Sequence, residues 1–422
     1  MKQNSFSPDL PEPKDSLLLF SLIALALSTA IINQYLSQAA MLAAICLCIP
    51  LLMQRSRGAP PLPAAWVFAL SFVSLAAVPM SLLSESARPL DAPLRYTVLI
   101  IPLLTLYRYE LPILPLLRCI SSAPLIAAVL VLGLDLYPET RFKLIDETRY
   151  DFGLGLLDSA FAAVLLLPMV VAQFTLDRGK LVWQMLSVLG ICAVFVIIVK
   201  SGTRASWLAL VSVPIIAQLL LARGSPRLLI TAVGAVGLIV AISYLTAPII
   251  KERVDAATSN VQQYLDGDSI NHKNSLGLRF DLWKVAIETF KRSPLLGTSY
   301  QERSAIKKEM IEAGRVTEHI GTDGKGSAHN EVLNALSMKG LFGLAAIFFL
   351  YLIPFRYFRK RCMLNDDRLQ RNISAAAASS VLMAAICGFA EAPLMSGRFS
   401  ILYGFLLVVM YALVEQRGRA AV

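Results

Sequence analysis

The sequence predicts an all-α polytopic membrane protein with about 12 membrane-spanning helices and one large polar loop. Three observations support this fold class. Of the 422 residues, 56% are hydrophobic and only 16% are charged, unlike a soluble domain. Apolar stretches of spanning length recur along most of the chain. A single long hydrophilic segment, 248–329, interrupts them late in the sequence.

A spanning helix needs about 20 mostly apolar residues. We predict that the second and fourth spans are short, and that prolines interrupt the fifth. The predicted spans are 16–32, 39–53, 64–83, 96–107, 116–134, 153–176, 181–199, 205–222, 228–247, 330–353, 373–390 and 400–414.

These spans divide the chain into three parts. Residues 1–247 hold the first nine spans, 248–329 form the large loop, and 330–422 hold the last three spans and a tail. Roughly twice as many lysines and arginines fall in one set of short loops as in the other. Because basic loops stay inside, we expect both termini in the cytoplasm and the large loop on the outer, periplasmic face.

The formal net charge of +10 reflects this topology, together with basic groups on the outer face. It does not indicate a nucleic-acid partner. Positive side chains at the surface of a membrane favour membrane lipids or a lipid-borne anionic substrate.

The large loop is expected to contain two amphipathic helices. One covers about 278–292, with Phe280, Trp283, Ile287 and Phe290 on one stripe. The other covers about 301–313, with Ile306, Met310 and Ala313 on one side.

Three basic residues are candidates for catalysis on the outer face. Arg204 opens the eighth span, Arg279 begins the first loop helix, and His329 ends the loop. Each alone has a structural interpretation, as a topology-setting charge, a solvated charge and a residue at a helix start. Asn330 could cap the tenth span, and it is also a candidate for substrate binding.

The segments around these residues resemble the O-antigen ligase and polymerase superfamily. The first is Ser201-Gly202-Thr203-Arg204-Ala205-Ser206-Trp207-Leu208. The second is Leu278-Arg279-Phe280 with Trp283, Pro294 and Gly297. The third is His329-Asn330 with Leu333, Gly340 and Gly343. Together they cover about 204–343.

Within this superfamily, the chain is most similar to the O-antigen ligases of Gram-negative inner membranes. The resemblance implies a GT-C-like, inverting, metal-independent glycosyltransferase with no cofactor. The enzyme would transfer a glycan from undecaprenyl pyrophosphate, the donor, to lipid A–core, the acceptor, in lipopolysaccharide biosynthesis. The matching residues are Arg204, Arg279 and His329.

The chemistry of these residues suits that reaction. Arginine offers a permanent charge and paired donors to a departing pyrophosphate. Histidine titrates near neutral pH, so it can accept the proton of an acceptor hydroxyl. We therefore assign His329 as general base, and Arg204 and Arg279 to the pyrophosphate.

Other charged residues could contribute on the same face. Lys200, Arg141 and Arg149 could bind glycan or phosphate, although plain loop or interface charges explain them as well. The histidine spacing fits no zinc site, so no metal is predicted. Ionisable groups within a bilayer usually face a cavity or a partner, and Asp158 and Lys339 are two such groups without an assigned role.

Three alternatives remain. An O-antigen polymerase would extend a lipid-linked glycan on the same fold. A protein O-oligosaccharyltransferase would usually carry a longer C-terminal extension. A lipid-linked-sugar transporter, which is not an enzyme, would place its site near the bilayer midplane.

Overall fold

The computed structural model describes residues 13–31, 34–53, 63–106, 111–135, 144–146, 149–150, 156–201, 275–322 and 326–418, with scattered positions between 203 and 259. The described helices are α1 (Pro13–Ser28), α2 (Gln34–Met53), α3 (Ala64–Leu75), α4 (Val78–Leu83), α5 (Asp91–Val98), α6 (Ile100–Leu106), α7 (Ile113–Asp135), α8 (Leu156–Leu176), α9 (Leu181–Ser201), α13 (Ser275–Arg292), α14 (Tyr300–Glu312), α15 (Glu331–Leu364), α16 (Arg368–Ala390) and α17 (Gly397–Gly418). Short 3-10 turns are η1 (Arg88–Leu90), η3 (Glu318–Ile320) and η4 (Pro393–Met395).

Helices dominate the described chain, as the sequence predicts for a polytopic membrane protein. The departure from an all-helical fold is a small antiparallel pair of strands, β1 (Leu144–Asp146) and β2 (Arg149–Tyr150). Within the described residues, 8 helical stretches are long and apolar enough to cross a membrane, and two shorter apolar helices accompany them. The predicted spans 205–222 and 228–247 lie almost wholly outside the described residues.

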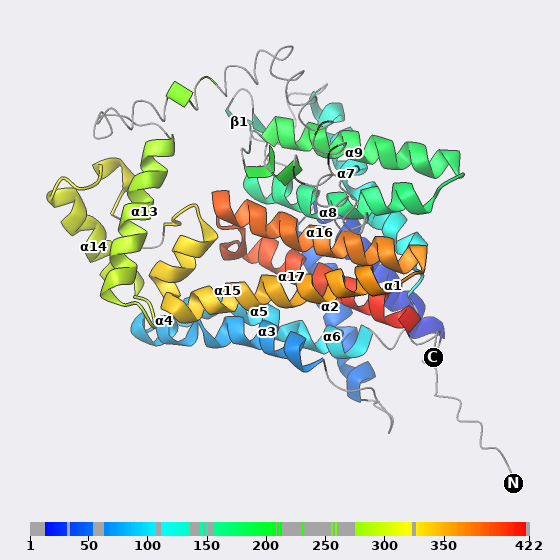
Figure 1. The fold of residues 1–422 in the computed structure, drawn as a ribbon, viewed down its shortest axis with the longest axis horizontal. Coiled ribbons are helices and arrows are strands. Elements are labelled where there is room, and N and C mark those ends of the chain that lie inside the picture. Colours follow the sequence, from blue (N-terminus) through cyan, green and yellow to red (C-terminus); the bar gives the residue numbers. More distant parts are fainter. Residues whose placement is uncertain are drawn as a thin grey trace, which may run out of the picture.

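The helices form a bundle with α8, α16 and α17 at its centre. These three helices are mostly buried, whereas α9 exposes large apolar side chains such as Leu181 and Met185. Helices α13 and α14 project from one end of the bundle, and α1 begins and α17 ends at the opposite end (Figure 1). Helices α13 and α14 therefore lie at the opposite end of the bundle from the start of α1 and the end of α17.

Helix α15 is broken at Gly340. This residue has φ 62° and ψ −153°, so the helix consists of a first piece, 331–339, and a second piece, 341–364. The break frees backbone N–H groups, which must find other acceptors. The N–H of Leu341 donates to Pro294 O at 2.8 Å, and that of Phe342 donates to Leu295 O at 3.4 Å. The predicted span 330–353 therefore lies within one apolar helical stretch, Glu331–Leu364, which is broken at Gly340.

The connection after α13 enters this break, and two glycines make the approach possible. A Cβ on Gly340 would lie 2.3 Å from Leu295 O, and a Cβ on Gly297 would lie 2.3 Å from the carbonyl of Met338. Both clashes involve backbone atoms, which cannot turn away as a side chain can. The Pro294…Gly297 and Gly340 parts of the motifs thus join the large loop to α15.

Gly340→Ala is expected to destabilise the protein more than Gly314→Ala. Gly314 has a similar φ of 65° but open space around its missing Cβ. Gly314→Ala therefore measures the cost of the left-handed backbone alone, about 1–2 kcal/mol. Gly340→Ala adds the backbone clash. Thermal unfolding of the purified variants in detergent would test this, and equal midpoints would show that the clash is relieved by movement.

Helices α13 and α14 pack on each other through a small core. Val285, Ile306, Met310 and Val316 are buried together. The N–H of Thr317 donates to Asp281 Oδ2 at 2.9 Å, which fixes η3 to α13. Helix α14 begins at an N-cap, Ser299, whose side chain accepts from Glu302 N.

The predicted apolar stripe of α13 is wrong in detail. Ile287 is exposed, whereas Leu282, Val285, Ala286 and Thr289 are buried. The reason is that α13 packs against both α14 and α15, so its buried surface is wider and rotated from the aromatic stripe. On α14, Ile306 and Met310 are buried as predicted, but Ala313 is the exposed C-cap.

A buried carboxylate joins α7 to the turn after α8, away from α13 and α14. Asp177 accepts from Arg118 Nη2 at 2.6 Å and from Arg118 Nε at 3.1 Å. These hydrogen bonds hold the pKa of the Asp177 carboxyl below its ordinary value. A lowered carboxyl pKa stabilises the fold above the unfolded pKa, and this stability is lost as the pH falls through the folded pKa.

Asp177→Asn is expected to cost about 1–2 kcal/mol at pH 7, because a charge-assisted pair becomes a neutral one. Below about pH 4 the Asp177 carboxyl of the unfolded chain protonates while the paired carboxyl of the folded protein stays ionised, so the difference in stability between the two proteins should shrink. Thermal unfolding between pH 7 and pH 3.5 would test this, with exposed Glu312→Gln as control. A difference that does not change with pH would contradict the pairing.

Candidate active site

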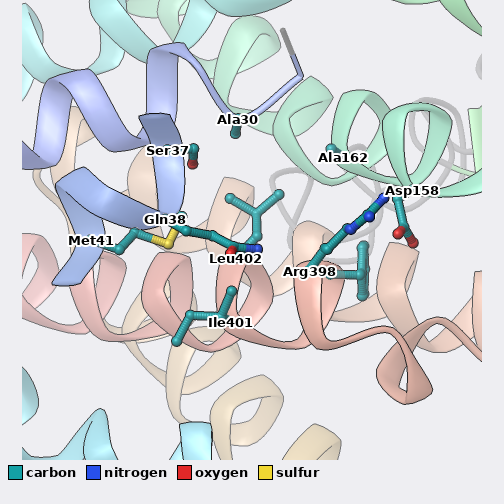
Figure 2. A pocket seen from close by; sticks show the side chains of 10 residues that line it. Ala30, Ser37, Gln38, Met41, Asp158, Ala162, Arg398, Ile401 and Leu402 are labelled. Atoms are coloured by element: carbon teal, nitrogen blue, oxygen red, sulfur yellow. The ribbon is translucent and has the colours of Figure 1, made fainter. Parts of the chain in front are cut away.

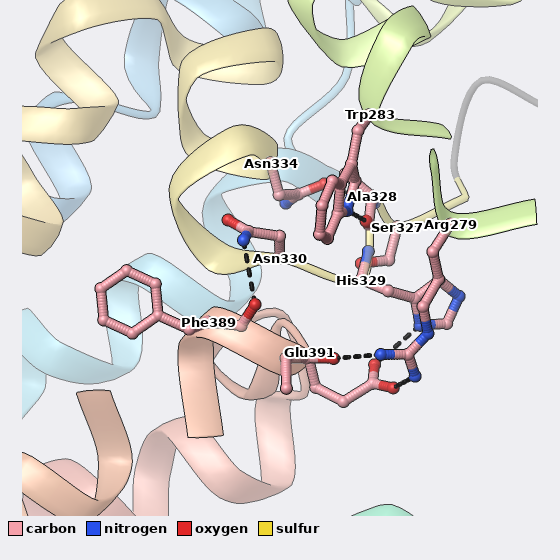
Figure 3. Close-up of polar contacts among 10 residues, drawn as sticks. Arg279, Trp283, Ser327, Ala328, His329, Asn330, Asn334, Phe389 and Glu391 are labelled. Carbon is pink, nitrogen blue, oxygen red and sulfur yellow. Dashed lines mark hydrogen bonds and ion pairs between the residues drawn. The ribbon is translucent and has the colours of Figure 1, made fainter. Parts of the chain in front are cut away.

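Glu391 is the centre of a polar cluster where the large loop meets the bundle. It directly follows α16 and is only 8% exposed. Its two carboxylate oxygens have different partners. Oε1 accepts from Arg279 Nη2, and Oε2 lies 2.7 Å from His329 Nδ1 (Figure 3). One carboxylate therefore brings Arg279 and His329 together from two separate segments.

The contact with Glu391 defines the tautomer of His329. A carboxylate can only accept, so Nδ1 carries the hydrogen and Nε2 keeps its lone pair. The His329 side chain is 39% exposed, so a substrate can approach it. A histidine held in this way by a carboxylate is arranged as a general base.

The backbone of His329 is held in an uncommon conformation. Its φ is +49°, in the left-handed region that residues other than glycine rarely adopt. Its N–H donates to Ser327 Oγ at 3.0 Å. The neighbouring Ala328 accepts from Trp283 Nε1 at 2.9 Å, and its N–H donates to Asn334 Oδ1 at 3.4 Å. These hydrogen bonds fix the backbone of residues 328 and 329 and thereby the position of the imidazole.

Arg279 and Asn330 cap the C-terminal end of α16. Arg279 Nη1 donates to Ala390 O at 2.6 Å, and Asn330 Nδ2 donates to Phe389 O at 2.9 Å (Figure 3). The last carbonyls of a helix lack partners within it, and a cation there interacts favourably with the helix dipole. Arg279 thus stabilises the same helix end that carries Glu391.

Asn330 is the N-cap of α15, as the sequence suggests. Its Oδ1 accepts from Leu333 N at 3.0 Å while its amide nitrogen binds α16. Trp283 donates its indole N–H to the carbonyl of Ala328 and so holds this residue beside His329.

The cluster leaves donors available for a ligand. Arg279 is 27% exposed and uses two of the five N–H donors of a guanidinium in the contacts above. The buried Glu391 holds the two exposed groups, which can face a common substrate.

The other predicted site residues are less defined. Arg204 and Arg141 lie outside the described residues, Arg149 lies in β2, and Lys200 lies in the last turn of α9. The structure brings Arg279, His329 and Asn330 together at the C-terminal end of α16. Among the described residues, no group of three or more His, Cys, Asp or Glu side chains could hold a metal ion.

Asp158 and Lys339 both have definite surroundings. Asp158 Oδ2 accepts from Ser396 Oγ at 2.7 Å, which joins α8 to the turn before α17. Figure 2 shows Arg398 directed toward Asp158 across a cavity of about 10 Å³, which is water-sized. Lys339 lies on a larger cavity of about 260 Å³. Each of the two therefore has a partner or a cavity, as expected for ionisable groups within spans.

Sequence reasoning missed Glu391. It lies in Ala390-Glu391-Ala392-Pro393, where a lone acidic residue follows an apolar span. The available signal was its position at a span end on the same face as the two motif residues. No sequence pattern links it to either of them.

Part of the chain matches a known family. Residues 188–348 match the family model described as O-antigen ligase. This interval contains Arg204, Arg279 and His329, and it confirms the resemblance stated from the motifs.

Two relatives are similar to this chain. An O-antigen ligase of Escherichia coli strain K12 is 23% identical over 220 residues, which is 52% of this chain and 52% of that protein. An uncharacterized protein of Haemophilus influenzae is 31% identical over 175 residues, which is 40% of this chain and 42% of that protein. The chain thus spans about half or less of the relatives it matches, so the whole protein's activity, substrates and partners are proposals.

Proposed function

Because residues 188–348 match the family model described as O-antigen ligase, we propose that this protein transfers a finished glycan from undecaprenyl pyrophosphate to lipid A–core. The reaction takes place on the periplasmic face of the inner membrane and inverts the anomeric centre. The observation that supports it most directly is the carboxylate of Glu391, which binds both Arg279 and His329.

The acceptor hydroxyl is activated at His329. With Nδ1–H donated to Glu391, the Nε2 lone pair takes the hydroxyl proton as the oxygen attacks the anomeric carbon. Glu391 stabilises the imidazolium that forms. A single displacement needs no carboxylate nucleophile. The carboxylate of the cluster, Glu391, is buried and contacts His329, so it is not offered to the substrate as a nucleophile.

The leaving group is stabilised by arginine. As the bond between the sugar carbon and the pyrophosphate oxygen breaks, negative charge develops on the pyrophosphate. The remaining donors of Arg279 bind its oxygens, and Arg204 is the second cation of the proposal. The two arginines thus stabilise the negative charge on the pyrophosphate, a role that a divalent cation has in other enzymes. The reaction is therefore proposed to be metal-independent. Lys200, Arg141, Arg149 and Asn330 complete the proposed substrate contacts.

A reconstituted transfer assay tests the function. Purified protein in proteoliposomes is given undecaprenyl-pyrophosphate glycan and lipid A–core, in the presence and absence of chelator. The proposal expects glycan on lipid A–core in both conditions. Loss of transfer with chelator would overturn metal independence.

The same assay separates the alternatives. Lengthening of the glycan on the undecaprenyl carrier would show a polymerase, and transfer to an added protein would show a protein O-oligosaccharyltransferase. Movement of the lipid-linked glycan across the bilayer, without transfer, would show a transporter.

A further inference from the structure

A second polar site lies beside the proposed active site, on the far side of the first piece of α15. It is a cavity of about 260 Å³ between α5, α14, α15 and the η1 and η4 turns. Glu331, Asn334, Ala335 and Met338 line it at helical spacing, so one face of the 331–339 piece forms its wall. His329, Arg279 and Glu391 are not among its lining residues.

Three cationic side chains from three separate elements line this cavity. Arg88 comes from η1, Arg303 from α14 and Lys339 from α15. Arg303 is fully buried, with its Nη1 3.1 Å from Met338 Sδ on the cavity wall.

Two carboxylates also face the cavity, but other groups engage them. Asp91 pairs with Arg95 at 3.1 Å, and Glu331 accepts from Leu394 N at 2.9 Å. Glu331 is close enough to Lys339 for their charges to interact, yet no ion pair within 4.0 Å joins Lys339 to a carboxylate in the described chain. The lining thus carries three cationic side chains and two carboxylates, an excess of one positive charge.

An unpartnered hydroxyl supports the presence of a ligand here. Tyr96 lines the cavity and is 2% exposed, and its Oη has no hydrogen-bond partner among the described residues. Buried hydroxyls usually have a partner, so the hydroxyl of Tyr96, a residue of the cavity lining, is a candidate donor to a bound anion.

The distance along α15 separates Lys339 from the place where the leaving group must lie. Lys339 lies eight residues after Glu331, which corresponds to about 12 Å along a helix axis. The donor pyrophosphate is bonded to the carbon that the hydroxyl held at His329 attacks, so it must lie next to the Glu391 cluster. A group that Lys339 binds is thus a second anion, further along the α15 wall.

We propose that this cavity binds a phosphate group of the glycolipid acceptor, with Lys339, Arg88 and Tyr96 as its donors. This inference rests on the proposed function, since it assigns the phosphate to the second substrate of that reaction. Asn334 joins the two sites, because it faces the cavity and also accepts from the N–H of Ala328 beside His329. Binding of the acceptor would place its hydroxyl at the imidazole.

Lys339→Met is the principal test, because methionine keeps most of the length of the side chain and removes its charge. The Michaelis constants for donor and acceptor are measured separately with proteoliposomes. Loss of one charge-assisted hydrogen bond predicts about a tenfold or greater rise in KM for the acceptor. KM for the donor should change by less than twofold. Lys308→Met, on the exposed face of α14, is the matched control and should change neither.

A dephosphorylated acceptor makes the assignment specific. In the wild type its KM should rise about as much as Lys339→Met raises it for the intact acceptor, and the variant should no longer distinguish the two acceptors. Arg88→Gln, at an exposed position, repeats the test without altering a buried residue. A rise in KM for the donor would assign the cavity to the donor and overturn the proposal. Unchanged constants would also overturn it.

A binding measurement separates this inference from the proposed function. Lipid A–core in nanodiscs is titrated into fluorescently labelled protein with no donor present. Weaker binding by Lys339→Met, confined to the phosphorylated glycolipid, would support the cavity even if the wild type transferred nothing. Equal binding by wild type and variant would overturn it even if transfer occurred.

Discussion

Glu391→Gln is expected to lower the rate of glycan transfer by about two to three orders of magnitude. A glutamine amide can donate to His329 Nδ1, and the imidazole would then carry its hydrogen on Nε2, where the base is needed. Arg279 would also lose its charged partner on α16. The measurement is the turnover of purified protein in proteoliposomes at saturating donor and acceptor.

The matched control for this variant is Glu415→Gln. Glu415 also accepts from an arginine, Arg361, and from Tyr357, but it lies near the far end of α17. We expect it to keep near wild-type turnover. If Glu391→Gln transferred glycan as fast as this control, Glu391 would be only a structural link between α13 and α16.

His329→Asn is expected to lower turnover by about two to four orders of magnitude, because no base remains to accept the hydroxyl proton. Asparagine is chosen because it tolerates a positive φ better than most residues, and His329 has φ +49°. The fold should therefore survive the loss of the imidazole. Turnover and thermal unfolding are measured on the same preparation.

A second histidine variant makes this result specific. His319→Asn replaces an exposed histidine in η3 and should leave turnover unchanged. A His329→Asn variant with wild-type turnover would remove His329 from the proton transfer.

Much of the fold follows from apolar patterning, because a bilayer imposes long hydrophobic runs. Helices α8, α9, α16 and α17 lie where the sequence places spans. The break at Gly340 does not follow from patterning, because apolar residues predominate in 330–353 and the loop that enters the break is remote in the chain. The predicted apolar stripe on α13 does not match its buried surface, because the helix packs against two neighbours, α14 and α15. A periodic pattern in the sequence indicates one buried face only.

Part of the candidate site could likewise be predicted from the sequence, and part could not. Motifs could indicate Arg279 and His329 because their neighbours in the sequence are distinctive. Glu391 could not be found in this way, since its role depends on the carbonyl end of α16 lying against α13. Contacts between distant segments decide which acidic residue meets which histidine, and a single sequence does not record them.

The meeting of Gly297 with Gly340 has a consequence for engineering. An attempt to change specificity by grafting α13 and α14 from a related protein would treat 275–322 as an exchangeable cassette. The two glycines lie on opposite sides of that boundary, and each excludes a side chain because of main-chain atoms contributed by the other segment. A successful chimera must therefore take the α15 segment around Gly340 from the same parent as the cassette.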